Sequence, residues 1–140
     1  MKMSGGNNVE FMKKFVELIN SASEKLAREL VSPEAIFHVP GRSEPMVGPA
    51  GYLAIVGMMR AGFPDIQWTV EELISESDKI AARFTMRGTH RGQFMGVLPT
   101  EKAITVQALN IYHLKNGQII KEYGAPDMLG LLAQIGALPC

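Results

Sequence analysis

The side chains that could do chemistry lie on separate segments of the chain. Asn110 interrupts the apolar series of a predicted strand, and a buried amide must find hydrogen-bond partners. Glu122 lies on the following strand, where a carboxylate among apolar neighbours would have the raised pKa that a general base near neutral pH needs. His90 ends the apolar face of an earlier strand, where it would act as an acid–base group or simply bond a neighbouring carbonyl. These three residues are the candidate catalytic residues.

The hairpin between the last two predicted strands decides which way Glu122 faces. A two-residue loop at positions 116–117 would put Tyr123 on the same face as Asn110. A three-residue loop, with Gly117 as a left-handed bulge residue, would put Glu122 there instead. Asn110 and Glu122 also have structural interpretations, as an amide bonded within the sheet and as a solvated strand carboxylate. The sequence leaves both registers open.

Aromatic and methionine side chains on the same predicted faces could wall a pocket for a planar or apolar molecule. Plain core packing would use the same residue types. His38, on a short strand near the expected opening, is a further polar candidate, with an exposed position at a loop edge as the alternative. The candidate ligand-binding residues are His38, Trp68, Phe84, Met86, Tyr112 and Phe94.

Composition and motifs argue against several other classes of protein. Lys and Arg number 14 and Asp and Glu number 14, so the basic surface of a nucleic-acid-binding protein is not expected. The three histidines are scattered and there is no phosphate-binding glycine loop, so neither a metal nor a cofactor is expected. Cys140, the last residue, is interpreted as an incidental thiol. The first eight residues lack the apolar run of a signal peptide and no run is long enough to span a membrane, so a cytoplasmic location is expected.

The periodicity of apolar residues predicts one α+β domain over residues 1–140. Helices are predicted at both ends and after the first short strand, and a capping signature at Ser21 suggests that the first helix breaks there. Long alternating strands twist, and helices laid across a curved antiparallel sheet leave a pocket at its open end. The predicted elements are a helix over 11–30 ended by Pro33, a strand over 35–39, a helix over 49–61, strands over 66–71, 82–90, 104–114 and 118–123, and a helix over 128–135.

Several stretches resemble the SnoaL-like polyketide cyclase family of the nuclear transport factor two-like superfamily. They are residues 81–92, Phe94-Met95-Gly96, Pro99-Thr100 and residues 127–136. The resemblance implies a cone-shaped α+β roll, also called cystatin-like, in which N-terminal helices cover a curved sheet. It also implies a homodimer and a cofactor-free aldol ring closure on a polyketide ester. The outward face of the sheet, predicted to carry Thr85, Thr89, Thr105, Gln107, Leu109 and Ile111, suits such pairing.

The sequence departs from the family pattern at both positions that carry acid–base groups. The resemblance implies an aspartate where this chain has Gly124, and a histidine where it has Asn110. Glu122 is the expected substitute base, since it lies two residues away on the same side of the strand, whereas Asp127 is expected to cap the last helix. The first hypothesis is therefore a cyclase or isomerase acting on a carbonyl substrate. The alternative is a binding protein for a small apolar or aromatic molecule that has lost the catalytic aspartate.

Epoxide hydrolysis or dehydration, found elsewhere in the superfamily, is a third interpretation. Hydrolysis of that kind needs an arginine between two carboxylates inside the pocket. The arginines near Arg83 are expected on the solvent face of their strand, so this interpretation ranks last.

Overall fold

The computed structural model describes residues 5–138 and confirms the predicted α+β class. Six strands form one curved sheet in the order β2-β1-β6-β5-β4-β3. Cys140 lies outside the described residues. The elements are α1 (Gly5–Ser21), α2 (Glu24–Leu30), β1 (Val31–His38), β2 (Met46–Val47), α3 (Gly48–Gly62), β3 (Gln67–Glu76), β4 (Lys79–Thr89), β5 (Ala103–Lys115), β6 (Gln118–Pro126) and α4 (Met128–Gln134).

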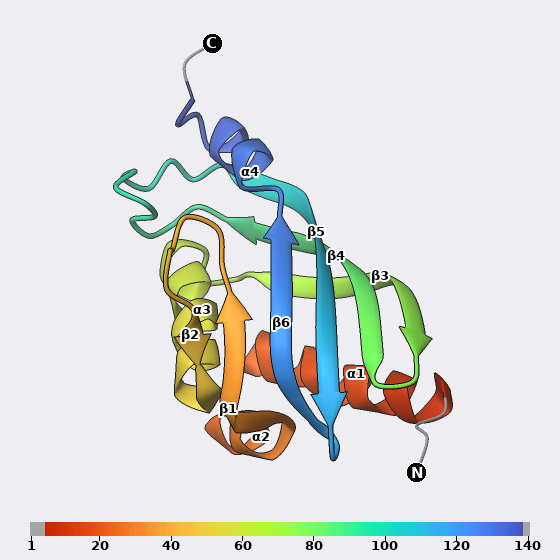
Figure 1. The fold of residues 1–140 in the computed structure, drawn as a ribbon. Coiled ribbons are helices and arrows are strands. Elements are labelled where there is room, and N and C mark those ends of the chain that lie inside the picture. The colour runs from red at the N-terminus through yellow and green to blue at the C-terminus, as the bar shows by residue number, and fades with distance from the viewer. Residues whose placement is uncertain (1–4, 139–140) are drawn as a thin grey trace.

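The N-terminal helices cover one face of the sheet and leave the other open. Figure 1 shows α1 crossing behind the strands and α3 lying beside β1 and β2. The apolar stripe of α1 is buried against the sheet, as its helical spacing predicts. Asn20, near the end of α1, accepts a hydrogen bond from the Trp68 backbone N–H at 2.8 Å and donates one to the Trp68 carbonyl at 3.1 Å. The amide thereby satisfies the backbone of edge strand β3 at this point.

The first helix breaks close to the predicted position. Ala22 has a φ of +55°, and Ser23 caps α2 by accepting a hydrogen bond from the Leu26 backbone N–H at 3.1 Å. The helical segment ends at Leu30, as predicted, but β1 begins at Val31, earlier than the predicted strand, so Pro33 lies within β1. The pairing of β1 with β6 shifts in register between Val31 and Ile36, and the missing N–H of a proline is tolerated at such a point.

The sheet is mixed rather than wholly antiparallel, because β1 runs parallel to β6. All other neighbouring strands pair antiparallel. Thr85, predicted on the solvent face of β4, is buried because a register shift in β3 brings Glu71 over it. The Thr85 hydroxyl donates to the Glu71 carboxylate at 3.0 Å.

The segment after β4 closes onto the end of α3. The backbone N–H groups of Arg91 and Gly92 both donate to the Gly62 carbonyl, at 3.1 and 3.0 Å. A side chain on Gly92 would collide with the Ala61 carbonyl oxygen, so only glycine allows this approach. Phe94, from the same segment, is buried against Phe63 with ring centroids 5.2 Å apart. Phe94 therefore anchors this segment in the core, whereas Met95 and Leu98 are exposed.

The hairpin between β5 and β6 combines a two-residue turn with a β-bulge. Asn116 and Gly117 both have positive φ and join the paired residues Lys115 and Gln118. Ile120 then has no opposing partner, because the register shifts between the pairs Leu114–Ile119 and His113–Lys121. The shorter of the two predicted loops is present, but the bulge turns Glu122 to the face predicted for the longer loop.

Candidate active site around Glu122

Glu122 lies at the centre of the helix-covered face of the sheet. It is opposite Tyr112 on β5 and beside Phe37 on β1, and both of these neighbours are fully buried. The glutamate itself is only 7% exposed. Its Oε1 atom is buried and has no hydrogen-bond partner. Most buried polar atoms do have partners, so an unpaired carboxyl oxygen here calls for a functional explanation.

Burial raises the pKa of Glu122 from 4.5 to about 8. An apolar environment disfavours the charged form of a carboxyl group. At neutral pH the carboxyl group is therefore mostly protonated. Its pKa is still close enough to neutral pH for the group to lose and regain a proton during a reaction.

Two tyrosines on different elements interact electrostatically with this carboxyl group. Tyr112 comes from β5, while α3 brings in Tyr52, which packs against Phe15 and Phe37 with ring centroids 5.3 and 4.8 Å away. Burial, followed by the nearby charge of Glu122, raises the pKa of both tyrosines well above its usual value. Both hydroxyls therefore keep their protons and can serve as hydrogen-bond donors.

Asn110 connects the site to the backbone of β6. Its Oδ1 atom accepts a hydrogen bond from the Ala125 backbone N–H at 3.1 Å. Its Nδ2 atom donates to the Tyr112 hydroxyl oxygen at 3.1 Å. Asn110 is one of the predicted site residues, and its side chain is half-buried. It therefore lies between the buried carboxyl group of Glu122 and more accessible space.

Gly124 lies directly beside the Glu122 carboxylate. A Cβ atom on Gly124 would lie 3.0 Å from Glu122 Oε2 and 3.5 Å from Asn110 Oδ1. The resemblance implies an aspartate at this position, and the Glu122 side chain brings its carboxylate to the point where that aspartate would begin. A side chain at position 124 would therefore crowd the Glu122 carboxylate.

His90, the third candidate catalytic residue, is not brought to this site. Asn110 is paired with Ala82 across the sheet, and His90 lies eight residues beyond Ala82, or about 26 Å along an extended strand. Its ring is fully buried against Phe63, with centroids 5.4 Å apart. Its Nδ1 atom accepts a hydrogen bond from the Thr100 backbone N–H at 3.2 Å.

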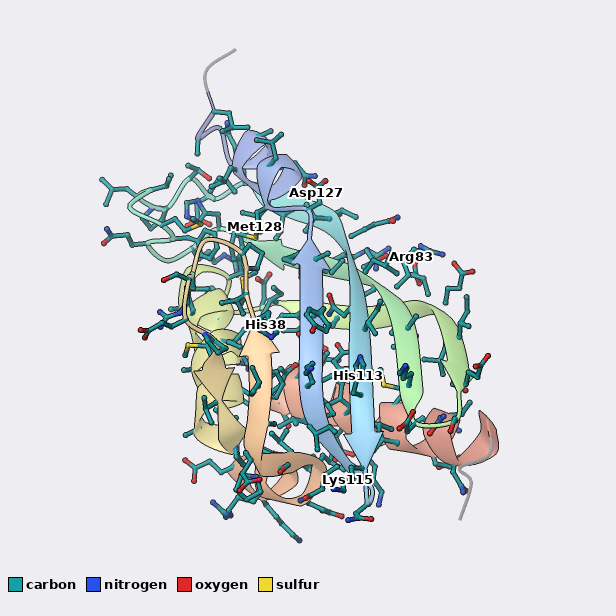
Figure 2. The ribbon with its side chains drawn as sticks, in the orientation of Figure 1. His38, Arg83, His113, Lys115, Asp127 and Met128 are labelled. Atoms are coloured by element: carbon teal, nitrogen blue, oxygen red, sulfur yellow. The ribbon has the colours of Figure 1, made fainter. Side chains whose placement is uncertain are left out.

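His38 lies on the opposite face of the sheet from Glu122. It is exposed and stacks on Tyr123, with centroids 4.9 Å apart and the ring planes at 6°. His113 contacts the other side of the same tyrosine, with centroids 6.1 Å apart. Figure 2 shows His38 at the end of β1 and His113 along β5. This arrangement matches the exposed alternative for His38.

The remaining candidate ligand-binding residues fall into two groups. Phe84, Met86, Phe94 and Tyr112 are all buried in the main core. Of these, Tyr112 belongs to the candidate site, where it lies opposite Glu122 and accepts a hydrogen bond from Asn110. Trp68 instead lines an open apolar groove of about 370 Å³ between α1 and β3. The residues lining that groove are Val9, Met12, Lys13, Val16, Trp68, Thr69, Val70 and Leu73.

Charged groups elsewhere add little to the site. Within residues 5–138, Glu122 is the only buried carboxylate, and Arg83 pairs at 3.1 Å with Glu72, whose side chain is largely exposed. Within the same range, no group of three His, Cys, Asp or Glu side chains could hold a metal ion.

Tyr52 is the site residue that sequence reasoning missed. Its spacing placed it among the apolar residues of the second predicted helix. The available signal was its hydroxyl group, because a tyrosine on a buried helix face usually finds a polar partner. That signal would have pointed from the helix towards a polar group on the sheet.

Fold and site together define a cone-shaped α+β domain with a buried acid. Residues 9–135 match the family model of the SnoaL-like polyketide cyclases, and the chain belongs to this family. It is 28% identical over 90 residues to nogalonic acid methyl ester cyclase from Streptomyces nogalater, covering 64% of this chain and 67% of that protein. It is 25% identical over 128 residues to aklanonic acid methyl ester cyclase AcmA from Streptomyces galilaeus, covering 89% and 88%.

Solved structures agree with this assignment. IdmH from Streptomyces antibioticus superimposes with a TM-score of 0.82 at 31% identity, covering 91% of this chain and 97% of IdmH. TsrD from Streptomyces laurentii has the same fold, with a TM-score of 0.85 at 24% identity, covering 97% and 99%. In the described part of the chain, no helix combines the length and apolar character needed to span a membrane.

Proposed function

We propose that this protein is a cofactor-free cyclase or isomerase that acts on a carbonyl substrate resembling a polyketide ester, with Glu122 as the general base. The observation that carries the proposal is a buried carboxyl group with an unpaired oxygen and a pKa of about 8. The charge of Glu122 also raises the pKa of two nearby tyrosines, Tyr52 and Tyr112. The two related methyl ester cyclases support the reaction class.

In the proposed reaction, ionised Glu122 takes a proton from the carbon next to a substrate carbonyl. The C–H bond breaks, its electron pair moves into the enolate, and an O–H bond forms on Glu122. The enolate carbon then attacks a second carbonyl of the same molecule. Glu122 returns the proton to the resulting alkoxide, so the ring closes without any other reactant. Donors near the enolate oxygen stabilise the charge that develops there.

Proton exchange at carbon provides a test that does not require the natural substrate. The protein is incubated in D₂O with a keto methyl ester whose uncatalysed exchange is slow, and deuterium uptake is followed by NMR. Wild-type protein should accelerate exchange, and Glu122→Gln should lower the rate by about a hundredfold or more, the range expected for a general base. Glu101→Gln is the matched control, because Glu101 lies at the surface in an ion pair with Arg91. Equal rates for wild type and Glu122→Gln would rule out the proposed base.

A second function, small-molecule binding without catalysis, is supported by a different observation. Gly124 and Asn110 stand where the family resemblance implies an aspartate and a histidine. A protein of this kind would bind a planar or apolar molecule, and Glu122→Gln would change its affinity but reveal no lost turnover. Turnover that depends on Glu122 would count against this alternative.

We also propose that the protein forms a homodimer through the open face of the sheet. Apolar side chains stand exposed there on neighbouring strands, with Leu109 at 57%, Ile111 at 43% and Tyr123 at 47%. Ile111 and Tyr123 pair directly across β5 and β6, so the exposed apolar surface is continuous. An exposed apolar patch on a sheet is typical of an interaction surface.

A further inference from the structure

The hydrogen bonds around Asn110 fix the direction of its amide group. The Ala125 backbone N–H can only donate, so the atom that faces it at 3.1 Å must be Oδ1. The other end of the amide is therefore Nδ2, which can donate hydrogen bonds but cannot accept them. Asn110 thus presents its amide nitrogen, and not its carbonyl oxygen, to Tyr112.

This fixed amide in turn determines what Tyr112 can do. The Tyr112 hydroxyl oxygen accepts the hydrogen bond from Asn110 Nδ2 at 3.1 Å, so its own proton must point away from Asn110. On the adjacent strand, Glu122 lies directly opposite Tyr112. The hydroxyl is buried in the core, where an unused donor is costly. Its proton is therefore available to an acceptor beside Glu122.

We propose that the Tyr112 hydroxyl donates a hydrogen bond to the enolate oxygen, and that Asn110 is a positioning residue that sets the direction of this hydroxyl. The inference rests on the proposed function, in which Glu122 generates the enolate. It changes the expected division of roles, because Asn110 acts through Tyr112 and does not touch the substrate. It also specifies the ligand chemistry as an enol or phenol oxygen that binds as an anion.

Binding of a phenolate provides a test that is independent of turnover. The probe is para-nitrophenol, whose ionisation is visible by absorbance, and the matched neutral probe is para-nitroanisole, its methyl ether. Both affinities are measured for wild type, Tyr112→Phe and Tyr52→Phe, with thermal melting as the check on folding. Tyr112→Phe should weaken nitrophenolate binding by about tenfold to a hundredfold, as expected for a lost hydrogen bond to a charged group. Binding of the methyl ether should stay within about twofold of wild type.

A double-mutant cycle tests whether Asn110 acts through Tyr112. Asn110→Leu should weaken nitrophenolate binding by about threefold to tenfold and leave the methyl ether unaffected. In the Tyr112→Phe background, the same substitution should have no further effect. If Tyr112→Phe fails to fold, Asn110→Leu alone must still weaken the binding of nitrophenolate more than the binding of the methyl ether. These measurements report on binding even if wild-type protein shows no turnover, or if Glu122→Gln shows that Glu122 is not the base.

Three results would overturn the inference. The first is that wild-type protein does not bind nitrophenolate. The second is that Tyr112→Phe weakens both probes equally, which indicates a packing role. The third is that Tyr52→Phe alone carries the loss, which would assign the donor role to the tyrosine on α3.

Discussion

Glu122 combines a buried position with an unpaired oxygen atom, and this combination sets how the site responds to pH. Only the ionised carboxylate can take a proton from carbon. With a pKa of about 8, the ionised fraction of Glu122 increases about tenfold per pH unit below that value. We therefore expect kcat/KM for carbonyl turnover or exchange to rise from about pH 6 and to level off above about pH 8. A profile that levels off near the ordinary carboxyl pKa would contradict this assignment.

The same carboxyl group also makes the stability of the fold depend on pH. Its pKa in the folded protein is about 8, against 4.5 for the ordinary group. Between these values the unfolded chain loses the proton while the folded protein keeps it, so stability falls as pH rises through this window. Glu122→Gln removes this dependence. The free energy of unfolding of Glu122→Gln, minus that of wild type, should therefore increase by a few kcal/mol between about pH 4.5 and about pH 8. Above about pH 8 the difference should stay constant.

Urea denaturation at the two ends of that window provides the measurement. The two proteins should differ much less near pH 4.5 than near pH 8, and the m-value should stay unchanged. Glu101→Gln, at an exposed position, serves again as the control. A stability difference that is independent of pH would mean that Glu122 is solvated in the folded protein.

At the level of elements, the close approach of the loop at Gly92 to the end of α3 leads to a paired prediction. Gly92→Ala should destabilise the protein by about 2 kcal/mol or more, because its Cβ would collide with the Ala61 carbonyl. Gly57→Ala, at a helical position with nothing near the added Cβ, should stabilise it by about 0.5–1 kcal/mol. Both values follow from urea denaturation curves. A tolerated Gly92→Ala would show that the loop is not held against α3.

The elements also show which parts of the fold could be predicted from the sequence. Apolar spacing predicted the helices and the long strands, because periodicity reflects which face of each element is buried. It could not predict the bulge at Ile120, because Ile119 and Ile120 are both apolar and hide the shift in alternation that an extra residue causes. The facing of Glu122 depended on that bulge. The parallel pairing of β1 with β6 was missed for a similar reason, because it depends on contacts between residues distant in the chain.

At the scale of the whole molecule, the open face of the sheet is where we expect two copies to meet. Leu109→Lys should place a charge within the exposed apolar surface and convert a dimer into a monomer. Met58→Lys, which adds the same charge at a position 52% exposed on α3, should leave the dimer intact. Sedimentation at micromolar concentration distinguishes the two states. A monomeric wild type would contradict the proposed pairing.

The unpaired buried carboxyl of Glu122 has a consequence for how such a chain can evolve. A group that lowers the stability of the fold near neutral pH is readily replaced by mutation when stability alone is selected. Glutamine or an apolar residue at position 122 would be the expected replacement in a descendant that no longer uses the site. Among descendants of this chain, a retained acid at position 122 would therefore indicate continued selection for the reaction rather than for the fold.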